Sequence, residues 1–316
     1  MNDYEADEYF PDFDGEYDSK GRPIRHTHKR SSRKTVRKLP QTTPVLSDFS
    51  DDATAWVPSY AAHLDPRHHE RQWLIESLSS FYRDNVIFDV IRQVKSGKEA
   101  NVYCCEAHPA TGVELIAAKL YRPRILRTLK NDAIYKAGRM LRGEDGKELK
   151  GRREKLALQQ KSKFGQHLDM VWWIGNEYAI QQKLHLSGAN VPKPIGHNGN
   201  AVLMEYIGDA RLAAPTLSDV TLSSDEAIRL FKITMDNIRI MLDNHLVHGD
   251  LSAFNILYWA GNISIIDFPQ VVNARTNPNA MNLLQRDIKR VCDYFARFGV
   301  KSDPILITRS LWEPYM

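Results

Sequence analysis

Asp250, Asn255 and Asp267 have the residue types and the spacing that a phosphoryl-transfer site requires. They lie in the stretch HGDLSAFNILYWAGNISIIDF, residues 248–268. Phosphoryl transfer has a loose transition state, so catalysis depends on positioning and on neutralising charge. One carboxylate faces the attacking nucleophile, while an amide oxygen and a second carboxylate can hold Mg²⁺, which prefers oxygen ligands. The stretch therefore predicts Asp250 as the catalytic aspartate and Asn255 and Asp267 as metal ligands.

The sequence around these residues predicts how they are brought together. A helix with an apolar end precedes the loop that carries the first of them, and residues 256–266 read as a β-hairpin with its turn at Gly261-Asn262. That hairpin would join Asn255 to Asp267. Each aspartate alone is also typical of a surface turn or a strand end, but the joint spacing favours a kinase-like site. His248 is expected to brace the loop through hydrogen bonds.

The N-terminal half contains the elements of a nucleotide site. Residues 94–103, VKSGKEANVY, place a small-residue turn between two strand-like stretches, which predicts a loop over phosphates. With only one glycine, an ordinary hairpin is an equal alternative. The apolar run LIAAKL, residues 115–120, has Lys119 near its end. In this arrangement the lysine ammonium is directed at phosphates. Glu177, in the helical run 172–186, is the best counter-charge, although it could also be a solvated helix carboxylate.

Together these segments resemble the RIO family of atypical serine/threonine protein kinases. The resemblance rests on SGKEANVY, AAKLY, VPKPIG, VLMEYIG, HGDLSAFNILY and IIDFPQ, and covers roughly residues 66–305. It is strongest to the type-1 branch. Type-2 members are implied to carry an N-terminal winged-helix domain, and there is no room for one here, because the helical segment 71–82 is the one helix expected before the nucleotide loop. The resemblance implies an α+β, two-lobed protein-kinase-like fold with a small β-rich N-lobe and a helical C-lobe.

The resemblance also implies roles for individual residues. Lys119 would contact the phosphates, with Glu177 as its partner. Asp250 would be the catalytic aspartate. Asp267 would hold the metal together with Asn255 and would also accept the γ-phosphate itself, as an aspartyl-phosphate. Three further residues are implied to line the nucleotide: Ser96, Gly97 and Val102. Glu205 and Ile207 are implied to form a hinge that hydrogen-bonds adenine through the backbone, with Met204 behind the hinge. The implied cofactors are ATP and Mg²⁺, with Mn²⁺ as a substitute.

The sequence departs from ordinary protein kinases after Asp267. Phe268-Pro269-Gln270 replaces the usual Phe-Gly, and no Ala-Pro-Glu motif follows. The activation segment and the peptide-binding helical lobe are therefore expected to be missing. Residues 278–298 have the apolar spacing of a helix that closes the C-lobe, with Asp287 near its middle.

Three parts of the chain are expected. Residues 1–62 would be a disordered tail and residues 311–316 a short C-terminal tail. Residues 63–310 would form the kinase domain, with the N-lobe at 63–204, a basic insertion at 122–168 within it, and the C-lobe at 208–310.

Charge is distributed unevenly along the chain. Residues 1–18 hold eight acids and no base, whereas residues 20–38 hold nine bases and no acid. Residues 122–163 hold fourteen bases against five acids. The basic segments 20–38 and 122–163 predict phosphate contacts with RNA or a ribosomal particle. A solubilising tail and a solvated helical insertion are the alternatives.

The function expected is ATP- and Mg²⁺-dependent serine/threonine phosphorylation, first of the chain itself and then of protein partners, with a role in small ribosomal subunit maturation implied by the resemblance. Two alternatives stay open: a small-molecule phosphotransferase of the aminoglycoside or choline kinase type, which also uses HGD and IDF motifs, and a nucleotide-gated binding switch with slow turnover. The chain has no apolar run of 18 residues and no leader pattern, so we expect no membrane partner and a cytoplasmic location.

Overall fold

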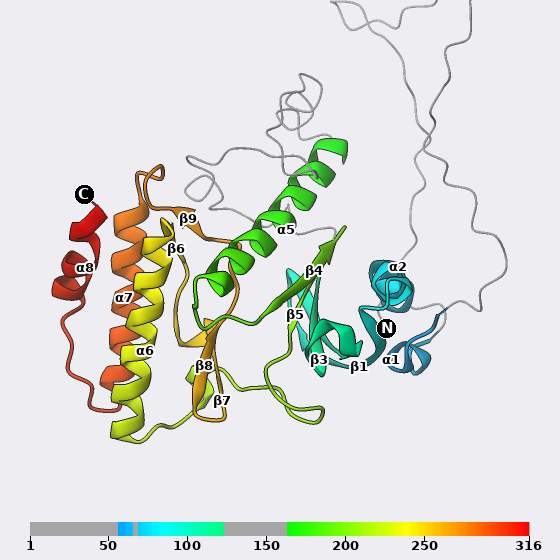
Figure 1. Ribbon diagram of the computed structural model, residues 1–316, viewed down its shortest axis with the longest axis horizontal. Helices are drawn as coiled ribbons and strands as arrows, with labels where there is room; N and C mark the ends of the chain where they lie inside the picture. Colours follow the sequence, from blue (N-terminus) through cyan, green and yellow to red (C-terminus); the bar gives the residue numbers. More distant parts are fainter. Residues whose placement is uncertain (1–55, 66–68, 123–162, 316) are drawn as a thin grey trace, which may run out of the picture. The chain divides into compact units, whose positions relative to one another are not determined.

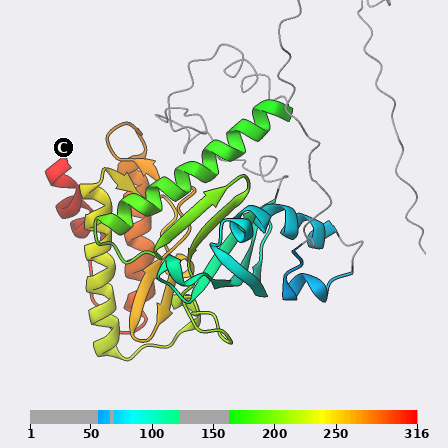
Figure 2. The same ribbon diagram turned by 45° about the vertical axis from the view of Figure 1, so that its right-hand side comes forward.

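The structure, a computed structural model, describes residues 56–65, 69–122 and 163–315, with side chains in the helix that begins at Lys163 described from residue 173 onward. Figures 1 and 2 show a β-rich N-terminal part followed by a mainly helical C-terminal part. The expected α+β fold with a β-rich N-lobe and a helical C-lobe is confirmed. The tail through residue 55, the basic segment 20–38 and residues 123–162 of the insertion lie outside the described residues.

The N-lobe is a five-stranded antiparallel sheet preceded by two helices. The sheet has the order β1-β2-β3-β5-β4. Its core contains Leu74 and Leu78 of the second helix together with Ile87 of the first strand, all fully buried. The elements are α1 (Ser59–Ala62), α2 (His69–Arg83), β1 (Ile87–Ser96), β2 (Ala100–Ala107), η1 (Pro109–Thr111), β3 (Leu115–Tyr121), β4 (Pro194–Asn198) and β5 (Ala201–Glu205).

The long helix α5 (Lys163–Leu186) lies beside β4, as Figures 1 and 2 show. Trp173 and Ile174 of α5 form a small buried cluster with Tyr121 at the end of β3 and Val202 of β5. The helix was expected only from residue 172, so its first turns extend into the range assigned to the basic insertion. This packing fixes the next turn of α5, which carries Glu177, against the strand that carries Lys119.

The C-lobe has its own hydrophobic core, built from three helices and short strands. Helices α6, α7 and α8 lie side by side in Figure 1. Helix α6 begins with an N-cap, because the Ser223 side chain accepts a hydrogen bond from the Glu226 N–H. Its elements are η3 (Leu217–Asp219), α6 (Ser224–Asp243), β6 (Leu246–Val247), η4 (Ala253–Asn255), β7 (Ile256–Trp259), β8 (Asn262–Ile265), β9 (Val272–Asn273), α7 (Ala280–Ala296), α8 (Pro304–Trp312) and η5 (Glu313–Tyr315).

The β7–β8 hairpin is present, with its turn one residue earlier than expected. Ala260 and Gly261 form the turn with φ angles of 48° and 79°, and Asn262 already pairs with Trp259. Two-residue hairpin loops favour positive φ at both central residues because that twist matches the flanking strands. Asn262 therefore starts the second strand instead of closing the turn.

The expected domain boundaries both fall within packed structure. Ala61 of α1 is fully buried in the N-lobe core, although residues up to 62 were assigned to the tail. At the other end, Leu311 is buried in the C-lobe core and Tyr315 packs against it. Short helices with one or two buried apolar residues give little periodicity, which explains why the sequence did not indicate them. None of the described helices has both the length and the apolar character needed to cross a bilayer.

Candidate active site

Lys119 lies at the centre of the site, between two carboxylates. Its Nζ is 2.8 Å from Glu177 Oε1 on α5 and 2.6 Å from Asp267 Oδ1, which follows β8. The Glu177 side chain is 1% exposed, and its second oxygen accepts a hydrogen bond from the Tyr121 hydroxyl. The lysine therefore connects the N-lobe sheet, helix α5 and the C-lobe.

Charge pairing controls the protonation of this centre. Burial by itself would lower the pKa of the Lys119 ammonium, but the carboxylates of Asp267 and Glu177 raise it well above its usual range. Burial likewise acts to raise the pKa of Asp267, and the Lys119 charge outweighs this so that the pKa falls below its ordinary value. Both groups are therefore charged at neutral pH.

Asp267 has an unusual backbone. Its φ is +72°, in the left-handed region that non-glycine residues rarely adopt. The next residue, Phe268, is 1% exposed and packs its ring 5.5 Å from the His248 ring. Such strain persists only where surrounding packing holds it. The buried Phe268 thus turns the Asp267 side chain, which is 45% exposed, toward Lys119.

The loop after β6 places Asp250 and Asn255 together. Asn255 Nδ2 donates to the Asp250 carbonyl at 2.9 Å and lies 3.4 Å from Asp250 Oδ2. His248 Nδ1 accepts from the Asp250 N–H at 3.3 Å, while its Nε2 lies 3.2 Å from the carbonyl oxygen of Ile266. Burial lowers the pKa of His248, so the ring is neutral and can make both bonds. The histidine braces the loop, as the sequence predicted.

Side chains of helix α7 form hydrogen bonds with the same loop. Asp287 Oδ2 accepts the Gly249 N–H at 2.8 Å, and Arg286 donates to the Gly249 carbonyl. One turn later, Arg290 Nη1 donates to Asp250 Oδ1 at 2.8 Å. We call these three side chains, Arg286, Asp287 and Arg290, the α7 clamp.

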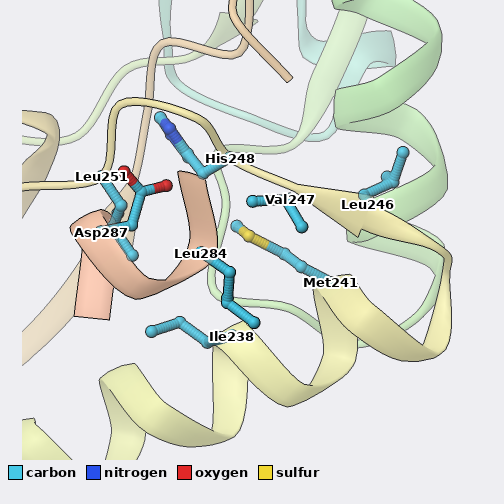
Figure 3. A pocket seen from close by; sticks show the side chains of 8 residues that line it. All are labelled: Ile238, Met241, Leu246, Val247, His248, Leu251, Leu284 and Asp287. Carbon is cyan, nitrogen blue, oxygen red and sulfur yellow. The ribbon is translucent and has the colours of Figure 1, made fainter. Parts of the chain in front are cut away.

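Asp287 is the most perturbed member of the α7 clamp. It is 2% exposed, and burial raises its pKa to about 7 despite the opposing charge of Arg286. Its Oδ1 receives no hydrogen bond from the described residues and lies 3.7 Å from Arg286. Figure 3 shows this carboxylate and the His248 ring in a pocket beneath the loop whose other lining side chains are apolar: Ile238, Met241, Leu246, Val247, Leu251 and Leu284.

The β1–β2 connection forms a tight turn at Gly97. The Gly97 N–H donates to the Ala100 carbonyl at 3.0 Å, and a Cβ at Gly97 would lie only 2.8 Å from that oxygen. Ser96 and Val102 flank the turn, and Val102 is the cross-strand partner of Lys119. Strand β2 therefore lies between β1, which ends at Ser96, and β3, which carries Lys119.

A polar network ties this turn to helix α2. Glu70 accepts hydrogen bonds from the Tyr103 hydroxyl at 2.8 Å and from Asn101 Nδ2 at 3.3 Å. Arg122 donates to Asn101 Oδ1 at 2.8 Å and reaches Ser96 Oγ at 3.3 Å. We call these five residues the α2 network. It anchors the nucleotide-loop side of the site as the α7 clamp anchors the catalytic-loop side.

The expected hinge follows β5. The Glu205 N–H donates to Lys193 at 2.8 Å, and the Ile207 carbonyl accepts from Ala214 at 3.0 Å. Within the described part of the chain, the Ile207 N–H makes no hydrogen bond. Met204 lies at the end of β5, next to the small cluster around Trp173. A backbone donor is therefore available at the position expected to meet adenine.

The residues expected to hold a divalent cation suit that task chemically. Asn255 uses its nitrogen on Asp250, which leaves Oδ1 for a ligand, and Lys119 contacts one oxygen of Asp267, which leaves the other. Mg²⁺ is usually held by one or two protein oxygens, with waters and phosphates completing the octahedron. Among the described residues, no group of three or more His, Cys, Asp or Glu side chains could hold a metal ion; the expected pair is one amide and one carboxylate.

The structure thus brings the sequence-predicted site residues into two contacting groups. Lys119, Glu177 and Asp267 are in direct contact, and Asp250 contacts Asn255. Val102 lies on β2 opposite Lys119, while Ser96 and Gly97 lie at the β1–β2 turn. Glu205 ends β5, and Ile207 follows it two residues later. Sequence reasoning missed the contacts of Arg286, Arg290 and Glu70. Asp287 had one available signal, because it is an acid between Leu284 and Ile288 on the buried face of α7.

Comparisons with known proteins show which family the chain is similar to. The RIO domain family model matches residues 134–306. The chain is 32% identical over 251 residues to the serine/threonine-protein kinase RIO1 of Homo sapiens, covering 79% of this chain and 39% of that protein. It is 33% identical over 245 residues to the Chaetomium thermophilum RIO1 kinase, covering 74% of this chain and 43% of that protein.

An archaeal relative is covered more fully. The RIO-type serine/threonine-protein kinase Rio1 of Thermoplasma acidophilum is 36% identical over 132 residues, which is 42% of this chain and 68% of that protein. By contrast, the chain spans only 39 to 45% of the length of the first eukaryotic relatives. Family model, relatives and fold agree, so this chain belongs to the RIO family of atypical kinases and is similar to its type-1 members.

Proposed function

We propose that this chain is an ATP- and Mg²⁺-dependent serine/threonine protein kinase of the RIO type that phosphorylates itself and protein partners. The observation that best supports this proposal is the position of Lys119, within 2.8 Å of Glu177 and 2.6 Å of Asp267. A lysine in this arrangement can bind phosphate oxygens while its helix partner keeps it in place. The names of the relatives support the same class of activity.

In the proposed mechanism, Lys119 binds the α- and β-phosphates beneath the turn formed by Ser96 and Gly97, with Val102 against the nucleotide. The backbone of Glu205 and Ile207 bonds adenine. Asn255 and Asp267 hold Mg²⁺, or Mn²⁺ in its place, which neutralises phosphate charge when bound.

Asp250 orients the acceptor hydroxyl. The bond between the hydroxyl oxygen and the γ-phosphorus forms as the bond from phosphorus to the ADP oxygen breaks. The hydroxyl proton passes to Asp250 late, because the transition state is loose.

We further propose that Asp267 can accept the γ-phosphate itself. A carboxylate oxygen would bond to the γ-phosphorus while the bond to ADP breaks, and water would then hydrolyse the acyl phosphate to regenerate Asp267 and release phosphate. The net reaction is ATP hydrolysis. The 45% exposure of the Asp267 side chain supports this role, because a phosphate must reach the carboxylate oxygen that Lys119 leaves open. This role competes with metal binding, which uses the same oxygen.

We also propose that the basic segments 20–38 and 122–163 bind RNA or a ribosomal particle in the cytoplasm, in keeping with a role in small-subunit maturation. The support is their charge, since clustered Lys and Arg neutralise phosphates without regard to sequence. Binding should weaken steeply as salt rises, which filter binding with a structured RNA at two salt concentrations would measure.

The experiment for the kinase proposal is incubation of wild type and Asp250→Asn with γ-labelled Mg-ATP, with choline and an aminoglycoside present as competing acceptors. We expect label on the wild-type protein and none on the variant. Label that is stable to both acid and hydroxylamine indicates serine or threonine, and hydroxylamine-labile label indicates an acyl phosphate, as proposed for Asp267. Label on the small molecules with bare protein would contradict the proposal and favour a small-molecule phosphotransferase. Tight ATP binding with no label anywhere would favour a nucleotide-gated switch.

A further inference from the structure

Arg290 contacts the proposed catalytic aspartate, and nothing in the mechanism above uses it. It lies on α7, 40 residues after Asp250, and its Nη1 donates to Asp250 Oδ1 at 2.8 Å. Its side chain is 41% exposed and that of Asp250 is 36% exposed, so the pair lies at the surface of the site. Exposed ion pairs contribute little to stability. The contact therefore calls for an explanation other than folding.

The other contacts of the loop fix its backbone but not this carboxylate. Asp287 and Arg286 bond the N–H and carbonyl of Gly249, while His248 takes the Asp250 N–H. At the side chain, Asn255 Nδ2 is 3.4 Å from Oδ2, which is long for a hydrogen bond. Arg290 thus makes the one short side-chain contact to Asp250 among the described residues.

The geometry leaves room for an acceptor. An ionised carboxylate has about four lone-pair positions, and the Arg290 bond occupies one on Oδ1. Oδ2 can still accept a hydroxyl proton while Arg290 holds the plane of the carboxylate. A guanidinium also stays charged at every working pH.

We propose that Arg290 is a positioning residue that orients Asp250 toward the acceptor hydroxyl. This inference rests on the proposed kinase function. It assigns Arg290 to the transfer step and not to nucleotide binding, because Arg290 contacts Asp250, whereas Lys119 contacts Asp267 and Glu177. Small errors in the orientation of a reacting group have large effects on rate.

The test compares Arg290→Met, Arg290→Lys and the control Lys289→Met in the full chain. Lys289 is adjacent on α7 and pairs with Asp293 in an exposed i,i+4 ion pair, so its loss reproduces the loss of a surface charge. For each variant we would measure the dissociation constant of Mg-ATP, the thermal unfolding midpoint and the single-turnover rate of label transfer to protein.

We expect Arg290→Met to lower the transfer rate roughly ten- to hundred-fold with an unchanged ATP dissociation constant and midpoint. Arg290→Lys should recover most of the rate, because it keeps one charged donor near Oδ1, and Lys289→Met should match wild type.

An unchanged transfer rate in Arg290→Met would overturn the inference. So would a loss of ATP binding or of the folded state in both Arg290 variants, because Arg290 would then be structural. If the wild type itself transfers no label, the proposed function fails and the Arg290 role fails with it, whereas an active wild type with an equally active Arg290→Met refutes the Arg290 role alone.

Discussion

The two charged centres of the site are built in opposite ways. The Lys119–Glu177 pair is almost sealed from solvent, with side chains 14% and 1% exposed, whereas the Arg290–Asp250 pair is 41% and 36% exposed. Breaking a buried pair leaves a charge without solvent and costs several kcal/mol, but an exposed pair contributes about 1 kcal/mol or less. In the proposed mechanism, the first centre therefore couples nucleotide binding to stability, and the second can tune transfer at little cost to the fold.

The anchors behind these centres differ as well. The α2 network reaches the nucleotide turn through neutral side chains and Arg122, with Glu70 as its acceptor. The α7 clamp holds the catalytic loop through three ionisable side chains from two successive turns of one helix. The turn is thus tied to helix α2 of the N-lobe, while the catalytic loop is tied to helix α7 of the C-lobe.

The largest effect should come from breaking the buried centre. Lys119→Met leaves Glu177 and Asp267 without their cation and should lower the free energy of unfolding by roughly 3 kcal/mol and abolish ATP binding. Adding Glu177→Gln should restore much of the stability, since the buried charge is gone, but not ATP binding. Urea unfolding and nucleotide titration would measure both. A Lys119→Met protein as stable as wild type would show that the pair is not desolvated.

Removal of the α2 anchor should have a smaller effect. Glu70→Ala removes the acceptor of the fully buried Tyr103 hydroxyl and should lower the free energy of unfolding by about 2 kcal/mol. The KM for ATP should rise while kcat stays near wild type, because the catalytic loop is anchored elsewhere. Glu76→Ala, on the same helix and hydrogen-bonded to Gln72 at the surface, is the control. If kcat fell by the same factor as the KM for ATP rose, the result would argue against separate anchors for the nucleotide turn and the catalytic loop.

The α7 clamp should give a pH dependence. The pKa of Asp287 is about 7 in the folded chain against an ordinary value of 3.8, so between these values the folded state holds a proton that the unfolded state lacks. The stability this proton contributes is complete below pH 4 and is lost as pH rises through 7. Relative to Asp287→Asn, wild type should lose up to about 1.4 kcal/mol per pH unit between pH 5 and 6.

Denaturant unfolding of both proteins at pH 5, 6 and 7 would check the sign. The lowered pKa of His248 affects both proteins alike and cancels in the difference. A constant difference across this range would mean that Asp287 stays ionised and that Arg286 dominates its environment.

The smallest effect should come from the hairpin turn. Gly261 has φ +79°, so Gly261→Ala should cost about 1 kcal/mol of folding free energy without changing ATP affinity. Gly175→Ala in α5 is the control for adding a methyl group without backbone strain. The φ of Gly175 is not positive, and an added Cβ would meet only the His197 ring, at 3.7 Å. Thermal unfolding of the two variants would separate turn strain from simple crowding.

The sequence predicted the parts of the site whose chemistry dictates residue type and spacing. Asp250, Asn255 and Asp267 follow from the needs of phosphoryl transfer, and apolar periodicity predicted α2 and α7 to within a few residues. The hairpin that joins Asn255 to Asp267 was predicted because alternating strands around a glycine are a local signal.

The anchors could not be predicted, because they depend on tertiary packing. Arg286 and Arg290 read as ordinary solvated residues on an amphipathic helix, and only the fold brings them to a loop some 40 positions earlier in the chain. Glu70 contacts residues 23 to 33 positions away, across two strands. Residues 123–162 lie outside the described residues, so the phosphate contacts expected of the basic segment 122–163 stay a prediction.

The most direct test of this account is to measure ATP affinity and single-turnover transfer side by side for Lys119→Met and Asp250→Asn. We predict that Lys119→Met loses ATP binding and transfer together, whereas Asp250→Asn binds Mg-ATP like wild type and transfers no phosphate. Loss of ATP binding in Asp250→Asn, or label transfer at the wild-type rate in either variant, would contradict the division of the site into a nucleotide-binding centre and a transfer centre.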